Sequence, residues 1–376
     1  MKFLHTGDLH IGKSLNEFSL LEDQAFFLDQ IIEITMQQKV DAVVLAGDIY
    51  DRSIPSTEAV SLLDRFLVSL SDKNIKVLMI SGNHDSSERV SFAGDILDKQ
   101  GIYIAGSIEE QPKTVTLKDT FGTIDFVLLP FVRPANVGTT NSREAVFKLL
   151  SNASTQSERK VLVTHFFVTD QDRLPELSDS ETTVHVGGLD HVEASLFTGY
   201  DYTALGHIHK PQQIGDRPVY YAGTPMKYSF SEVHQTKSVQ IVTFNEPGNL
   251  RVEKVEIPLL HDFRKIKGKL EELIAPETVS LADPQDYLQV TLTDEDELID
   301  PMGTLRSVYP NVCQILFEKN DLSEREIEFE AKVRNASIPE LFAEFYEYVR
   351  GSELPEDRKD LIRILEKEAQ EGGKGL

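Results

Sequence analysis

The sequence is short of the features that mark secreted and membrane proteins. Its single cysteine, Cys313, cannot form a disulfide framework and is typical of a reducing compartment. No apolar run approaches the roughly 18 residues that a bilayer span needs. Residues 1–5 enter a predicted strand directly and leave no room for a signal peptide. These absences predict a cytoplasmic location.

Basic side chains are also scarce. Lys and Arg number 38 against 62 Asp and Glu, which gives a net charge of -24. This deficit argues against a nucleic-acid partner, because contacts from Lys and Arg to phosphates supply most non-specific affinity for DNA. The excess of acidic residues is unevenly distributed along the chain, since residues 261–376 carry 27 acidic and 15 basic side chains, a net of -12. DNA binding is therefore not excluded, and we expect a partner protein to provide much of it.

Five short polar clusters carry the chemistry of this chain. They read Gly-Asp-Leu-His at 7–10, Gly-Asp at 47–48, Gly-Asn-His-Asp at 82–85, Thr-His at 164–165 and Gly-His-Ile-His at 206–209. Each follows a short apolar run that predicts a buried strand, at 2–6, 40–46, 75–80, 161–163 and 202–205. Because ligands bind at the carboxyl ends of strands in open α/β sheets, we expect the clusters to meet there.

The clusters contain seven candidate metal ligands: Asp8, His10, Asp48, Asn83, His165, His207 and His209. Hard oxygens and imidazoles without a thiolate favour Mn, Fe or Zn over Ca or a structural zinc–thiolate site. In an extended segment, residues two apart point to the same side, so Asp8 with His10, and His207 with His209, can each chelate one ion. Seven ligands exceed the needs of one ion. A two-metal centre with Asp48 as its bridge is the simplest interpretation.

A single Asp-x-His or Gly-Asp pair is usually a turn, because Gly and Asp favour tight turns on their own. Five such clusters in order, each at a strand end, make that explanation improbable. His165 is the weakest of the ligands, since Thr-His is no motif by itself and His185 and His191 are rivals. We prefer His165 because a credible central strand precedes it. His5 and His261 are expected to be structural.

Taken in order, the clusters resemble the motifs of the calcineurin-like metallophosphoesterases: D-x-H, G-D, G-N-H-[DE], H and G-H-x-H. Three longer segments resemble bacterial double-strand-break repair nucleases within that superfamily, namely residues 5–12, 129–134 and 221–232. The resemblance covers residues 1 to about 320. It implies an α/β fold, with a metallophosphoesterase β-sandwich flanked by helices, a small α+β capping domain and C-terminal helices.

The resemblance also implies a mechanism with two divalent ions, Mn above all, with Mg as the alternative. One ion is then held by Asp8, His10, Asp48 and His209, and the other by Asp48, Asn83, His165 and His207. Two ions can lower the pKa of a shared water and stabilise both oxygens of an in-line displacement. His84 is the candidate to protonate the leaving oxygen, and Asp85 is expected to orient its imidazole.

The activity implied is that of a nuclease subunit in DNA repair, recombination and replication. It comprises exonuclease action on double-stranded ends and endonuclease action on single strands and hairpins. ATP dependence would come from a separate ATPase subunit, within a heterotetramer that contains a homodimer of this chain. Two alternatives are a binuclear phosphodiesterase for small nucleotides and a non-catalytic scaffold. The basic residues that could contact DNA phosphates are Lys13, Arg52, Arg89, Arg133, Lys210 and Lys227.

A length of 376 residues and a hydrophobic content of 40% predict two or three domains with filled cores. Residues 1–258 hold every metal motif and contain amphipathic stretches at 20–38, 57–70 and 143–150. Residues 259–320 are predicted to be the capping domain, with strands at 263–267, 287–293 and 312–318 and helices at 269–275 and 297–308. Residues 321–376 are predicted to hold a linker and partner-binding helices.

The C-terminal helices are expected at 338–349, after a capping box of Ser337 and Glu340, and at 356–370. Each has an apolar face that must be buried against something. The residues proposed to bind a partner are Leu341, Phe342, Phe345, Val349, Leu361 and Leu365. The alternative is that these faces pack back on the phosphoesterase domain.

Overall fold

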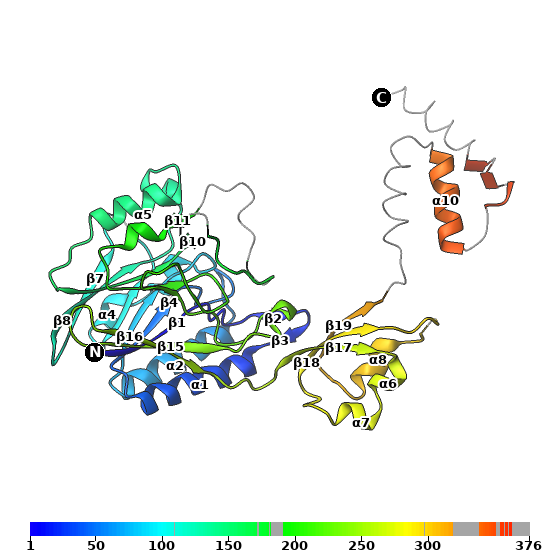
Figure 1. The fold of residues 1–376 in the computed structure, drawn as a ribbon, viewed down its shortest axis with the longest axis horizontal. Helices are drawn as coiled ribbons and strands as arrows, with labels where there is room; N and C mark the ends of the chain where they lie inside the picture. Colours follow the sequence, from blue (N-terminus) through cyan, green and yellow to red (C-terminus); the bar gives the residue numbers. More distant parts are fainter. Residues whose placement is uncertain are drawn as a thin grey trace, which may run out of the picture. The chain divides into compact units, whose positions relative to one another are not determined.

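A computed structural model gives the fold of the chain (Figure 1). It describes residues 1–108, 110–170, 173–179, 181, 191–296, 298–318, 338–350, 354–356, 358–359 and 361–362. The chain divides into two units, residues 1–316 and 317–376, and each is described by itself.

Two six-stranded sheets form the centre of the first unit (Figure 1). In spatial order, the first sheet contains β16 (Leu250–Glu256), β15 (Ser238–Phe244), β1 (Lys2–Thr6), β4 (Ala42–Ala46), β5 (Lys76–Ile80) and β6 (Ile102–Ala105). The second contains β13 (Gln212–Gln213), β14 (Val219–Tyr221), β12 (Tyr202–Gly206), β9 (Arg159–His165), β8 (Gly122–Leu129) and β7 (Lys113–Asp119). Strands β1, β4, β5 and β6 are parallel, as are β8, β9, β12 and β14.

The two sheets pack face to face around an apolar core. Phe3 of the first sheet contacts Phe126 of the second with ring centroids 5.4 Å apart, and Val44 and Val163 belong to the same buried cluster. Strand β4 is buried along its whole length. A strand covered on both faces has no polar side, which explains why its sequence is a continuous apolar run without alternation.

Helices cover the outer faces of the sandwich (Figure 1). On the first sheet lie α1 (Leu21–Gln38) and α2 (Thr57–Asp72), and on the second lies α5 (Ser142–Ser151). The shorter elements are β2 (Ser14–Leu15), β3 (Phe18–Ser19), α3 (Ser87–Val90), α4 (Gly94–Asp98), β10 (Val168–Thr169) and β11 (Val192–Glu193). The layers are therefore helix, sheet, sheet and helix, which confirms the predicted fold class.

The start of α2 depends on a side-chain cap. The hydroxyl of exposed Ser56 accepts a hydrogen bond from the Ala59 N–H at 3.2 Å. We expect Ser56→Ala to lower the free energy of unfolding by about 1 kcal/mol, because it leaves a helix-terminal donor without its cap. Urea denaturation measures this change. The control is Ser61→Ala on the same helix, whose hydroxyl donates to the Thr57 carbonyl at 2.9 Å; a loss equal to that of Ser56→Ala would contradict the capping role.

The region predicted as a capping domain forms a separate three-stranded sheet of β17 (Phe263–Gly268), β18 (Tyr287–Leu292) and β19 (Val312–Phe317). Helices α6 (Leu270–Leu273), α7 (Pro276–Val279) and α8 (Pro301–Arg306) accompany it. The predicted strands and helices occur in the predicted order, but the helices are shorter than predicted and α7 is an additional helix that was not predicted. Helix α8 begins at Pro301 because Asp300 caps it, accepting from the Gly303 N–H at 3.0 Å, and proline is favoured at a first helical position.

In the second unit, α10 (Ile338–Arg350) matches the first predicted C-terminal helix. Phe342 and Phe345 are 44% and 56% exposed, and Leu341 is half-buried. The described residues of the second predicted helix, at 356, 358–359 and 361–362, are helical, and Leu361 is exposed. Ser337, Leu365 and the side chain of Val349 lie outside what the structure describes.

Candidate metal centre

The five polar clusters all lie at carboxyl ends of strands, as predicted, but the strands belong to two sheets. Strands β1, β4 and β5 precede the first three clusters in one sheet, and β9 and β12 carry the other two in the second sheet. The loops are joined by backbone hydrogen bonds from Asp8 N–H to the Gly47 carbonyl at 3.0 Å and from His10 N–H to the Asp48 carbonyl at 2.9 Å. The candidate centre therefore lies where the two sheets meet.

The backbone at this centre is strained. Four candidate ligands have positive φ angles, namely Asp8 (52°), His10 (43°), Asp48 (47°) and His207 (102°). Non-glycine residues adopt such angles at a cost, and this kind of strain gathers at functional sites. Glycine is required beside them: a Cβ on Gly82 would lie 2.1 Å from Asp48 Oδ1, and one on Gly47 would lie 2.5 Å from His165 Nδ1.

The candidate ligand atoms form two groups that share Asp48. In the first, the atoms of Asp8, His10 and His209 lie within 4.8 Å of one another, with 3.3 Å between the Nε2 atoms of the two histidines. In the second, Asn83 Oδ1 lies 3.0 Å from both His165 Nε2 and His207 Nδ1.

Asp48 Oδ2 lies 3.8 Å from His10 Nε2 and 3.4 Å from His165 Nε2. One carboxylate oxygen therefore faces both groups, as a bridge between two ions requires.

The electrostatics of the centre fit divalent cations. Asp8 and Asp48 are both buried, and burial raises the pKa of Asp8 well above its ordinary value. Burial lowers the pKa of His10 well below its ordinary value, which keeps its imidazole neutral, and its buried Nδ1 has no hydrogen-bond partner among the described residues. Burial opposes a charge on His165, but Asp48, Asp8 and the Ala46 carbonyl together outweigh it and raise the pKa of His165 to about 9. A bound cation would stabilise the negative charge of these buried carboxylates.

His84 lies beside the ligands and is half-buried. Its Nε2 is 4.0 Å from Asp48 Oδ2, and its Nδ1 is 3.0 Å from the carbonyl oxygen of Asp51. The backbone N–H of His84 also donates to Asp48 Oδ1 at 2.9 Å. The ring is thus held next to the bridging carboxylate, within reach of a group bound at the metals.

The contacts of Asp85 differ from those expected. Its carboxylate accepts three backbone N–H groups, from Ile49 at 3.0 Å, Tyr50 at 2.9 Å and Gly82 at 2.8 Å. Burial raises the pKa of this carboxyl to about 6, with the Asp48 charge adding to the effect. Among the contacts described, the Asp51 carbonyl is the oxygen that lies against the His84 ring. Asp85 fastens the loop after β4 to the loop after β5, and so acts on the position of Asp48.

The histidines proposed as structural, or as rivals of His165, have other surroundings where they are described. His5 is buried with its Nδ1 2.9 Å from the Tyr202 hydroxyl, and burial lowers its pKa to about 3. His261 lies 3.1 Å from Asp23. His191 is half-buried at the edge of a loop, and His185 lies outside the described residues. Among the described histidines that were rivals for this role, His165 is the one whose ring lies against Asn83 and Asp48.

Sequence reasoning missed several residues that hold the ligands in place. Gln24 of α1 donates to the His10 carbonyl at 2.7 Å and accepts from the Gly12 N–H at 2.8 Å. The Tyr228 hydroxyl donates to the carbonyl of Leu9. Gln24 has no local sequence signal, because its role depends on a helix packing against a distant loop. Tyr228 lies in the 221–232 segment that carried the nuclease resemblance, so that segment was the available clue.

A further pattern in the first cluster has a structural explanation. Residues 7–14 match Gly-x-x-x-x-Gly-Lys-Ser, the pattern of a nucleotide phosphate loop. Such a loop joins a strand to a helix, whereas here Ser14 begins strand β2 and Lys13 pairs with Asp51 at 2.8 Å. Asp8 and His10 of the same segment face the metal centre. The match is therefore coincidental.

The candidate phosphate contacts are mostly engaged elsewhere. Lys13 pairs with Asp51, Lys210 pairs with Glu176, and Lys227 is buried and pairs with Asp262 at 2.7 Å. Arg52 is 79% exposed, and its Nε lies 3.6 Å from Asp51 Oδ2. Arg52 has the most exposed side chain of these four basic residues, so it is the best placed of them to reach a substrate in solvent.

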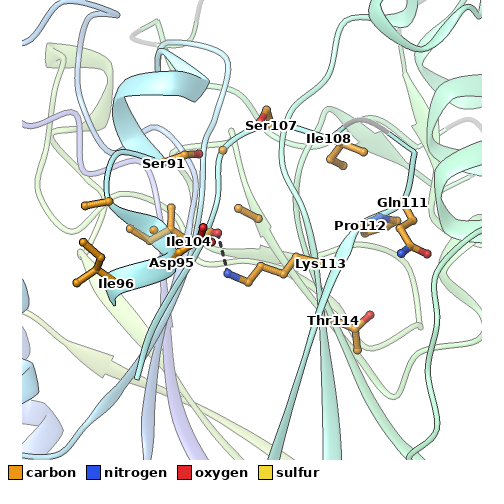
Figure 2. Close-up of a pocket in the computed structure, with 14 residues that line it drawn as sticks. Ser91, Asp95, Ile96, Ile104, Ser107, Ile108, Gln111, Pro112, Lys113 and Thr114 are labelled. Carbon is orange, nitrogen blue, oxygen red and sulfur yellow. Dashed lines mark hydrogen bonds between the residues drawn. The ribbon is translucent and has the colours of Figure 1, made fainter. Parts of the chain in front are cut away.

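A cavity of about 660 Å³ lies away from the centre, between α4 and strands β6 and β7 (Figure 2). There Lys113 Nζ donates to the Ile104 carbonyl oxygen at 3.2 Å and contacts Asp98 at 2.7 Å. Its lining includes no candidate ligand. The chemistry therefore belongs to the metal centre and not to this cavity.

The fold and the ligand arrangement define a metallophosphoesterase, and the chain belongs to the calcineurin-like phosphoesterase family, whose model matches residues 1–211. Residues 259–350 match the type 5 capsule protein repressor C-terminal domain. Two similar proteins are each named as the D component of the nuclease SbcCD. The one from Staphylococcus saprophyticus is 30% identical over 391 residues, which span 100% of both chains. The one from Staphylococcus epidermidis is 29% identical and covers 97% of this chain and 98% of its own.

These comparisons confirm the resemblance found in the sequence and the prediction of a metal-dependent phosphoesterase with divalent ions as cofactors. Within the described part of the chain, no helix is both long and apolar enough to cross a membrane.

Proposed function

We propose that this chain is a metal-dependent DNA nuclease that works with an SbcC-like ATPase. The observation that carries the proposal is the convergence of seven ligand-capable side chains, with Asp48 between the other six. Full-length similarity to two proteins named as components of the nuclease SbcCD supports the choice of DNA as substrate. We propose Mn for both ions, with Mg as the alternative, because the resemblance to the repair nucleases implies it; oxygen and imidazole ligands without a thiolate are consistent with Mn.

The chain's residues have distinct tasks in this mechanism. The two ions, when bound, supply an activated water and stabilise charge on the phosphate. Asp8, His10 and His209 hold one position, Asn83, His165 and His207 hold the other, and Asp48 faces both. His84 donates a proton to the leaving oxygen from its Nε2 side, since its Nδ1 is held by the Asp51 carbonyl.

The domain assignment belongs to this proposal. Residues 1–258 are the nuclease domain, and 259–320 are a capping domain that contacts DNA beside the centre. Residues 321–376 are a linker and partner-binding helices. The substrates are double-stranded ends for the exonuclease and single strands or hairpins for the endonuclease. In the complete complex, a homodimer of this chain lies within a heterotetramer.

A nuclease assay tests the function. Purified full-length protein is incubated with Mn, Mg or no added metal, against linear duplex DNA, a hairpin and bis-p-nitrophenyl phosphate. We expect metal-dependent cleavage of all three. Cleavage of the small diester alone would favour a phosphodiesterase for small nucleotides, and no cleavage with either metal would favour a scaffold.

The exposed apolar face of α10 is proposed to dock on the ATPase subunit. Phe342 and Phe345 lie three residues apart, and aromatic anchors of this kind commonly dominate helix-in-groove binding. We expect Phe342→Glu with Phe345→Glu to abolish co-purification with the partner, because two charges would enter an apolar groove. Hydrolysis of bis-p-nitrophenyl phosphate should be unchanged.

The control for this double variant is Phe147→Glu, which adds charge at another exposed phenylalanine, on α5. It should co-purify normally. If the double variant loses hydrolysis of the small diester while the partner still binds, the α10 face packs on the enzyme itself and the docking proposal fails.

A further inference from the structure

A buried ion pair lies behind the metal ligand His209. The side chains of Glu232 and Lys237 have no exposed surface, and they contact each other at 2.5 Å. Lys237 Nζ also donates to Thr224 Oγ1 at 2.8 Å, to Gln235 Oε1 at 2.9 Å and to the His209 carbonyl at 3.3 Å. The ammonium group is therefore fixed by several acceptors, and one of them is the backbone of the ligand itself.

Glu232 lies on the side of the His209 ring that faces away from the metal centre. Its Oε1 lies 3.9 Å from His209 Nδ1, whereas His209 Nε2 lies 3.3 Å from His10 Nε2 among the ligand atoms. A carboxylate behind a ligating imidazole fixes the ring's tautomer and orientation and raises its basicity. The ring of His209 stands between this carboxylate and the first metal position.

The second metal position has a different support. The Nδ1 of His165 lies 2.8 Å from the carbonyl oxygen of Ala46, which is a neutral acceptor. A neutral carbonyl polarises an imidazole less than a carboxylate does, because it carries no net charge. The two groups of ligands thus differ in their support. The carboxylate behind His209 belongs to no candidate ligand, whereas the acceptor behind His165 is a neutral oxygen and the carboxylate near it, with Oδ1 4.0 Å from His165 Nδ1, is the candidate ligand Asp8.

A buried ion pair is a poor source of stability in itself, because the cost of desolvating two charges offsets their attraction. Its place behind a metal ligand gives this pair another use. We propose that Glu232 and Lys237 are positioning residues for His209 that make the position of Asp8, His10 and His209 the tighter of the two metal positions. The inference rests on the two-metal centre of the proposed function.

The same segment supports the ligands in a second way. The Tyr228 ring packs edge-on against His10 and His209, with centroids 5.5 and 6.1 Å apart. The Tyr228 N–H donates to Glu232 Oε1 at 3.3 Å. Residues 228–232 therefore form one support beneath two ligands of the first position, which gives a physical role to this part of the 221–232 segment.

Calorimetric titration of the full-length chain with Mn²⁺ tests the proposal without using activity. We expect the parent to bind two ions with unequal affinity. Glu232→Gln should weaken the tighter ion by about 10–100-fold, because it removes the charge behind His209. The other affinity should stay within about twofold.

Two further variants, each weakening one metal position, show which of the two ions Glu232→Gln affects. In Asn83→Ala, which weakens the second position, Glu232→Gln should lower the affinity of the remaining ion. In Asp8→Ala, which weakens the first position, Glu232→Gln should have little effect. The reverse pattern would overturn the proposal.

A second variant separates positioning from stability. Glu232→Gln alone leaves the Lys237 charge buried without its partner and should lower Tm, whereas adding Lys237→Met removes that charge and should restore Tm. Under the proposal, the double variant regains Tm while the first ion stays weakly bound. If the double variant recovered both its Tm and its affinity for the first ion, the ion pair would have only a structural role.

The matched control is Asp286→Asn, which removes a carboxylate charge paired with Arg264 at 2.6 Å in the capping region. It should leave both Mn²⁺ affinities unchanged. If the parent binds fewer than two Mn²⁺, the two-metal centre itself fails, and this inference fails with it. If the parent binds two and Glu232→Gln binds both as tightly, the positioning role alone is overturned and the proposed function stands.

Discussion

Asp48→Asn is expected to reduce nuclease activity by about 10³-fold or more while the fold persists. The variant keeps the shape of the side chain and the Oδ1 that accepts the His84 N–H, so the loops stay joined. It loses the charge that faces both ligand groups, at 3.8 Å from His10 and 3.4 Å from His165. Metal assistance is worth several kcal/mol, and each 1.36 kcal/mol is a factor of about ten in rate.

Metal analysis and circular dichroism beside the nuclease assay check this result. The control is Asp125→Asn, another buried aspartate, which accepts from Thr116 and Ser157 and lies outside the ligand set. It should keep two Mn per chain. An Asp48→Asn protein that still bound two ions and cut DNA at the parental rate would exclude the bridging role.

His84→Gln is expected to keep both ions and lose about 10²–10⁴ in rate, the usual contribution of a positioned acid or base. Its ring lies 4.0 Å from Asp48 Oδ2, outside the two ligand groups proposed above, although its nitrogen is close enough to His10 and Asp48 to ligate an ion. Kinetics measured together with metal content therefore decide its role.

His234→Gln, at a histidine outside the ligand set, is the control for this substitution and should behave as the parent. Loss of one ion together with activity in His84→Gln would make His84 a ligand. Full activity in His84→Gln would make it a spectator.

The candidate ligands could be predicted from sequence because each cluster is a local event. In four of the five, an apolar strand ends, a glycine permits a sharp turn, and the next side chains point into the crevice; Gly47 and Gly82 show how little space remains for anything larger. In the fourth, His165 is the last residue of its strand. The lengths of the strands and of α10 follow from equally local patterns. The β-sandwich was predicted only from the resemblance of the five clusters, in their order, to the motifs of the calcineurin-like metallophosphoesterases. Local patterns alone did not predict it.

What the sequence could not predict depends on contacts between distant segments. Nothing in the sequence indicated that the Asp85 carboxylate accepts the backbone N–H groups of Ile49 and Tyr50, which come from a distant loop. The pairing of Glu232 with Lys237 behind His209 requires separate segments to pack together. Helix α8 was predicted at 297–308 but spans Pro301–Arg306, because the Asp300 side chain caps it and Pro301 is its first residue.

Anomalous diffraction at the manganese edge, from crystals of the full-length chain grown with Mn²⁺, tests the central claim most directly. The account predicts two peaks about 3.5–4 Å apart, the separation typical of two-metal sites. One should lie nearest His10 and His209, the other nearest Asn83 and His207, with Asp48 between them. A single peak, or two peaks that do not share Asp48, would contradict the account.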